Sequence, residues 1–149
     1  MKSIIYSLTL ILLLTSCDDC KDISCFTPPP SFSFEIVDKQ TEENLFTNGT
    51  YSEDQIQVFN TLTNNPIDYT FIGEEDINII NIFSLGWETE EVDVTIKIGE
   101  DIEFNFFVDA ERKNEDCCSF TEINEFSVEN IDYALLQFSP YAVTILVEN

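Results

Sequence analysis

The chain has 149 residues, of which 29 are acidic and six are basic, so its formal net charge is −23 at pH 7. Such a charge repels nucleic acid and anionic lipid headgroups, and it excludes nucleic acid as an expected partner. Apolar residues still make up 44% of the chain and include 13 phenylalanines, which predicts a folded acidic domain and not a disordered one.

The first 16 residues have the features of a secretory signal. Lys2 supplies a positive start, and the apolar stretch 4–14 ends in small residues before Cys17. A membrane-spanning helix needs about 20 apolar residues, whereas the acidic pair at 18–19 ends this stretch earlier. We therefore expect residues 1–16 to be a signal peptide.

The end of this signal, Leu14-Thr15-Ser16-Cys17, resembles the lipobox of bacterial lipoproteins. In such proteins the cysteine thiol receives a diacylglyceryl group and becomes the mature N-terminus. Acyl chains such as palmitate then hold the protein on a membrane, because two or more chains on one residue anchor stably. The resemblance implies lipidation at Cys17 and a membrane as the partner of that lipid. A cleaved signal with a coincidental cysteine is the alternative.

Residues 17–30 are expected to form a tether between the lipid and the domain. The segment is short and polar, and Pro28-Pro29-Pro30 favours extended polyproline II geometry at its end. The remaining residues, 31–149, show no internal repeat and no second domain boundary. We therefore predict one domain after the signal and the tether.

Period-two alternation of apolar and polar residues dominates this domain. It predicts strands near residues 32–36, 56–58, 67–71, 77–85, 92–98, 102–108, 123–128 and 141–147. The clearest hairpin joins 92–98 to 102–108 through Gly99-Glu100-Asp101, because a short turn with glycine links two clean alternations. Apart from one helical turn that could form at 131–137, no helical period is present.

Seven or eight short strands separated by turns predict an all-β fold, namely an antiparallel β-sandwich that is Ig-like or of a related Greek-key type. A shift of one residue in strand pairing would move every side chain of a strand to the opposite face of the sheet. The apolar pattern of the hairpin therefore specifies its register. We expect the outward residues to be Asp93, Thr95 and Lys97, and the mostly buried ones to be Val92, Val94, Ile96, Ile98, Ile102, Phe104, Phe106 and Val108.

Four cysteines remain once Cys17 is assigned to the lipid: Cys20, Cys25, Cys117 and Cys118. An exported protein meets an oxidising compartment, so an even number predicts two disulfides. Neighbouring side chains in a strand point to opposite faces, so Cys117 and Cys118 should take separate partners. We expect both to bond back to Cys20 and Cys25, in an order that the sequence leaves open. A zinc site is the alternative, but adjacent cysteines do not suit it.

Catalytic and cofactor motifs are missing from the sequence. The chain has no histidine, which excludes Ser-His-Asp and Cys-His nucleophiles and histidine metal ligands. It also has no glycine-rich phosphate loop. Acidic clusters near predicted loops lack the spacing of an EF-hand calcium site and are expected to be solvated. We therefore predict a non-enzymatic protein without a cofactor or a metal.

Three aromatic residues are candidate ligand contacts. Phe59 and Phe107 lie on the faces opposite to the apolar sets of their strands, and Trp87 follows a glycine in an acidic segment. Aromatic rings exposed on a sheet or loop suit stacking on glycans or contact with proteins. The alternative is that all three pack within the domain.

The N-terminal features together resemble small lipoproteins of the Bacteroidota. The resemblance rests on the lipobox, the acidic and lysine-containing stretch 18–22, the Pro28–Pro30 spacer and the Asn/Ile/Glu/Phe-rich composition. It implies an uncharacterised lipoprotein on the outer face of the outer membrane, although under the enterobacterial rule Asp18 would retain it at the inner membrane. The expected function is a binding or accessory module for a glycan or protein at the cell surface. A structural or inhibitory envelope protein with a protein partner is the alternative.

Overall fold

The computed structural model describes residues 25–74, 77–115, 117–136 and 139–148. The predicted signal, Cys17 and Cys20 lie outside these residues. The described part contains one 3-10 turn, η1 (Glu53–Gln55), and ten strands: β1 (Cys25–Phe26), β2 (Phe32–Asp38), β3 (Ile56–Asn60), β4 (Tyr69–Glu74), β5 (Ile77–Ile82), β6 (Glu90–Ile98), β7 (Ile102–Glu115), β8 (Cys118–Glu129), β9 (Asp132–Leu135) and β10 (Ala142–Val147).

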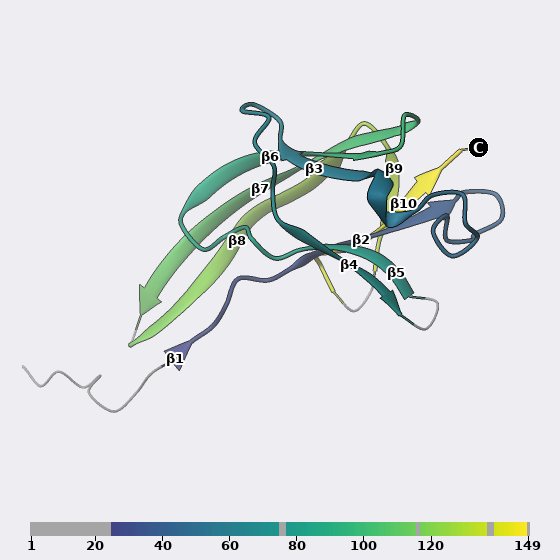
Figure 1. Ribbon diagram of the computed structural model, residues 1–149. Helices are drawn as coiled ribbons and strands as arrows, with labels where there is room; N and C mark the ends of the chain where they lie inside the picture. The colour runs from purple at the N-terminus through teal and green to yellow at the C-terminus, as the bar shows by residue number, and fades with distance from the viewer. Residues whose placement is uncertain (1–24, 75–76, 116, 137–138, 149) are drawn as a thin grey trace, which may run out of the picture.

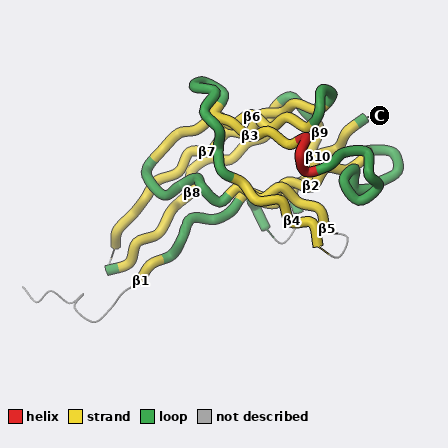
Figure 2. Tube along the Cα trace, in the orientation of Figure 1, coloured by secondary structure: helices red, strands yellow, loops and turns green. Residues whose placement is uncertain are grey.

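These strands form two sheets, as a β-sandwich requires (Figures 1 and 2). Sheet A has the order β1-β8-β7-β6-β3, and sheet B has the order β4-β5-β2-β10-β9. The prediction of an all-β sandwich is therefore confirmed. Ten strands are present in the described residues, slightly more than the seven or eight expected.

The expectation of purely antiparallel sheets is wrong, because each sheet contains one parallel pair. β10 runs parallel to β2 from Ala142, opposite Ser33, to Val147, opposite Asp38. β1 runs parallel to the start of β8. Parallel neighbouring strands are joined by long connections, so no local turn sequence predicts their pairing. The sheets are mixed.

The core lies between the two sheets and is rich in phenylalanine. Phe34 of sheet B packs against Phe104 and Phe106 of sheet A, with ring centroids 5.7 Å and 4.9 Å apart. Phe32 also contacts Phe106, at 6.0 Å. All four rings are fully buried. Offset and tilted aromatic pairs at these separations add to the stabilisation that comes from burial alone.

The β6–β7 hairpin has the predicted register, with Val94 opposite Phe106 and Ile98 opposite Ile102. All eight of its predicted core residues are buried except Val92, which is half-buried against the core. Asp93 is exposed, as expected.

Thr95 lies on the outer face of sheet A, as predicted, but it is buried there and not exposed to solvent. The chain that leaves β3 folds over it, and the hydroxyls of Thr61 and Thr95 share a hydrogen bond of 2.9 Å. Lys97 is partly covered as well. The alternation gave the correct face for Thr95 but could not show that a loop covers that face.

Segment 131–136 does not form a helical turn. β9 occupies Asp132–Leu135 and pairs antiparallel with β10, which makes it the edge strand of sheet B. In the parts of the chain that the structure describes, no helix is long and apolar enough to cross a membrane.

A disulfide joins Cys25 to Cys118 and pins β1 to the start of β8. This bond confirms one of the two predicted pairings. Cys117 is disulfide-bonded too, whereas the expected role of Cys20 lies outside the described residues. The strand-alternation argument does not apply to this pair, because Cys117 has a φ of 71° and precedes the strand that begins at Cys118.

Candidate functional site

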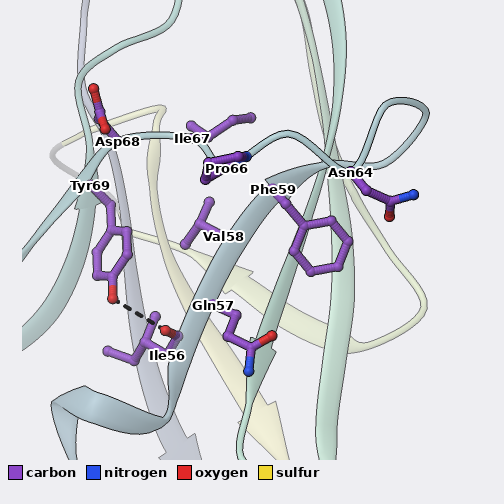
Figure 3. A pocket seen from close by; sticks show the side chains of 9 residues that line it. All are labelled: Ile56, Gln57, Val58, Phe59, Asn64, Pro66, Ile67, Asp68 and Tyr69. Atoms are coloured by element: carbon purple, nitrogen blue, oxygen red, sulfur yellow. Dashed lines mark hydrogen bonds between the residues drawn. The ribbon is translucent and has the colours of Figure 1, made fainter.

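A groove of about 640 Å³ lies where the chain leaves sheet A at β3 and enters sheet B at β4 (Figure 3). Its volume falls in the range typical of small-ligand sites, and it is open to solvent. The residues that line it come from β3, the β3–β4 connection and the first residue of β4: Ile56, Gln57, Val58, Phe59, Asn64, Pro66, Ile67, Asp68 and Tyr69.

The groove exists because the outer edge of β3 is partly covered by its own connection. β6 pairs with the other edge of β3. On the groove side, the Ile67 amide donates to the Val58 carbonyl at 3.0 Å, and Phe59 forms an isolated bridge with Pro66. Pro66 has no amide hydrogen, so at its position it cannot donate to β3. The groove therefore lies along an edge of β3 that its own connection pairs with only in part.

Tyr69 forms one wall of the groove. Its hydroxyl donates to the Ile56 carbonyl at 3.2 Å, which satisfies another acceptor on the same edge of β3. Burial raises the pKa of Tyr69 above its usual value near 10, and the negative charge of Glu53 raises it further. The phenol therefore keeps its proton at physiological pH and remains a hydrogen-bond donor.

Phe59 gives the groove an aromatic wall on the other side of β3. Figure 3 shows its ring and Gln57 on one side of the strand, with Val58 and Tyr69 on the opposite side. The ring is half-buried, and the Lys97 ammonium lies 5.7 Å from its centroid. Lys97 also forms an ion pair with Glu103 at 2.8 Å. A cation over the ring face holds the ring in place.

The polar residues of the groove are the exposed side chains of Gln57, Asn64 and Asp68. Together they offer amide donors, amide acceptors and one carboxylate beside an aromatic face. Such groups bind and orient a polar ligand. The groove residues include no serine, cysteine or lysine that could act as a nucleophile.

The structure separates the three aromatic residues that the sequence singled out. Phe59 lines the groove. Phe107 is half-buried on the outer face of sheet A, opposite Asp93, and β6 lies between its strand and β3. Trp87 is exposed in the β5–β6 loop and stacks on Phe26. Only Phe59 belongs to the groove, and Trp87 belongs to a different surface.

Sequence reasoning missed the remaining residues of the groove. The Asn64-Asn65-Pro66 turn and the out-of-phase Phe59 were the available signals, but the position of Tyr69 depends on how β4 joins the second sheet. In the described ranges, no group of three or more Cys, Asp or Glu side chains is arranged to hold a metal ion. Comparisons with models of known families, with curated proteins and with solved structures find no match.

Proposed function

We propose that this protein is a lipid-anchored, non-enzymatic binding module of the bacterial cell surface, on the outer membrane. The lipobox-like end of the signal supports the anchor at Cys17. The Cys25–Cys118 disulfide fits an oxidising compartment outside the cytoplasm. The chain has no histidine, and the groove has no serine, cysteine or lysine, which favours binding over catalysis.

The groove beside Phe59 is the observation that supports the binding function best, and its chemistry favours a neutral saccharide. A sugar ring has an apolar face that can stack on an aromatic ring, and hydroxyls that match amide and carboxylate side chains. Gln57, Asn64 and Asp68 supply those groups in the groove that Phe59 also lines. The strongly negative chain disfavours anionic ligands, since like charges repel.

Phe59→Ala should weaken saccharide binding about tenfold or more, as truncation of a central aromatic contact commonly does. The measurement is isothermal titration calorimetry of the purified protein against neutral oligosaccharides selected on a glycan array. Phe107→Ala is the matched control, because it removes a half-buried ring from the same sheet face outside the groove. If Phe59→Ala and the unmodified protein bind the saccharide with equal affinity, the groove is not the binding site.

The anchor is tested by Cys17→Ser. This change removes the thiol that would receive the diacylglyceryl group, so we expect loss of labelling when cells are grown with a fatty-acid probe. Cys25→Ser is the control, since its thiol lies in a disulfide and not in the lipobox-like motif. Labelling of Cys17→Ser at the level of the unmodified protein would refute lipidation at this residue.

A structural or inhibitory role with a protein partner is the second candidate, and β9 favours it. All four residues of this edge strand are exposed, including Tyr133 and Leu135, and apolar Leu136 follows. An exposed strand edge can pair with an extended segment of another protein. Binding of a protein that Leu135→Lys abolishes and Phe59→Ala leaves intact would favour this candidate over the saccharide.

A further inference from the structure

Three exposed aromatic residues, Phe26, Phe83 and Trp87, are linked by two contacts and are called the aromatic patch. They are 58%, 44% and 45% exposed, respectively. Phe26 and Trp87 stack, with centroids 5.9 Å apart and planes at 22°. The Trp87 indole nitrogen donates to the Phe83 carbonyl at 3.0 Å. The indole thus has its hydrogen-bond partner within the protein and presents its ring to the outside.

The Trp87 side of the patch is held by the backbone next to it. Gly86 has a φ of 79° and is buried, and a Cβ there would lie 3.1 Å from the Thr121 methyl. Its amide donates to the Glu90 carboxylate at 2.6 Å, and its carbonyl accepts from the Thr121 hydroxyl at 2.6 Å. Glycine is required at this conformation and contact, so the loop presents Trp87 in one position.

The Phe26 side is held by Arg112. The guanidinium carbon lies 5.0 Å from the Phe26 centroid. The same group donates to the Thr27 carbonyl at 3.0 Å and to the Thr121 hydroxyl at 2.9 Å. Phe26 is therefore fixed on β8 by a stacked cation and by the β1–β8 pairing. The patch is preformed, so a binding partner would not need to order it.

The patch lies next to the point where the chain enters the domain. Cys25, the neighbour of Phe26, is bonded to Cys118 at the start of β8. Seven residues separate Cys25 from Cys17 in the sequence. A chain of that length spans at most roughly 30 Å. Figure 1 shows β1 beside the β7–β8 end of the domain, away from the C-terminus. A lipid on Cys17 would hold this end close to the bilayer.

We propose that the aromatic patch rests in the headgroup region of the bilayer that holds Cys17, and that it orients the domain on the membrane. This inference rests on the proposed lipid anchor. Tryptophan and other aromatic rings favour the membrane interface, where an apolar ring meets a polar layer. A zwitterionic surface is the expected occupant, because a chain with a net charge of −23 is repelled by anionic headgroups.

The single tryptophan of the chain makes the proposal directly testable, since all indole fluorescence comes from Trp87. The lipidated protein is purified from membranes and reconstituted into phosphatidylcholine vesicles, with and without bromine on the acyl chains near the headgroup. Bromine quenches indole fluorescence at short range. We expect quenching of Trp87 in the brominated vesicles and its loss in the double variant Phe26→Ser with Phe83→Ser. Leu62→Ser, which changes an exposed leucine in the β3–β4 connection, should remain quenched.

Vesicle flotation on the same samples tests the lipid anchor separately from the contact between the aromatic patch and the membrane. Protein that floats with the vesicles but shows no quenching retains its anchor and overturns the proposed membrane contact. Quenching that persists in the double variant overturns it too, because the two phenylalanines would then not place Trp87 at the interface. Protein that does not float refutes the lipid anchor, and the membrane contact with it. Flotation with quenching that depends on Phe26 and Phe83 supports both.

Discussion

Phe104→Ala should lower the free energy of unfolding by about 3–5 kcal/mol, the usual cost of removing a fully buried phenylalanine. The Phe104 side chain is 0% exposed. Its ring contacts Phe34 of the opposite sheet at 5.7 Å, so the substitution would open a cavity between the two sheets. Urea unfolding followed by circular dichroism measures the loss.

Phe107→Ala is the matched control for this experiment, because it makes the same chemical change three positions along β7. Its side chain is half-buried on the outer face of sheet A, so the decrease in the free energy of unfolding should be clearly smaller than for Phe104→Ala. A Phe107→Ala loss equal to or above that of Phe104→Ala would contradict the assignment of inner and outer faces.

Removing the disulfides is the second change with a large expected effect. Cys25 and Cys118 are 93 positions apart, and closing a loop of about that length stabilises by about 4–5 kcal/mol in the chain-entropy model. Cys117 is also bonded. If its partner is the predicted Cys20, that bridge joins the same two segments. Either bridge alone then closes the long loop, and the other adds only a short ring.

The free energy of unfolding of the double variant Cys25→Ser with Cys118→Ser should therefore fall by only about 2–3 kcal/mol, the stabilisation expected from closing a short ring. Complete reduction of the unmodified protein should lower its free energy of unfolding by about 4–5 kcal/mol more than this variant loses. Denaturant unfolding with and without dithiothreitol would measure the difference. Under reducing conditions the variant and the unmodified protein should be equally stable, which controls for the serines. A double variant as unstable as the reduced protein would contradict the pairing of Cys117 with this N-terminal segment.

Much of the fold could be predicted because burial imposes a period of two on strands. The alternation from Val92 to Val108 allowed one register around Gly99, and the structure has that register. The inward set could be identified residue by residue, since a shifted register would have buried Glu103 and exposed Phe104. Local pattern and turn chemistry were sufficient for the β6–β7 hairpin, whose strands follow each other in the chain and pair.

Long-range pairing could not be predicted in this way. The parallel alignment of β10 with β2 joins the two ends of the domain, and no turn sequence encodes it. β9 lacks a buried face, so its residues show no alternation that would reveal a strand. Thr95 is covered by Thr61, a contact made by the path of a loop and not by the strand pattern.

The two candidate surfaces show the same limit. Phe59 could be identified because it is out of phase with Ile56 and Val58, but the groove also needs Tyr69 from the other sheet. Trp87 could be identified as a loop aromatic, but its stacking partner Phe26 is distant in the sequence and is brought to it by β1 pairing. Single residues could be found from the sequence, whereas their grouping required the topology.

The proposed cell-surface function depends first on the lipid anchor, which the intact mass of the mature protein tests most directly. The protein would be extracted with detergent from the membrane fraction of cells that produce it, and then analysed by mass spectrometry. We predict a chain that begins at Cys17 and exceeds the mass of residues 17–149 by a diacylglyceryl group, with or without a further acyl chain. An unmodified chain, or one that begins at another residue, would contradict this account.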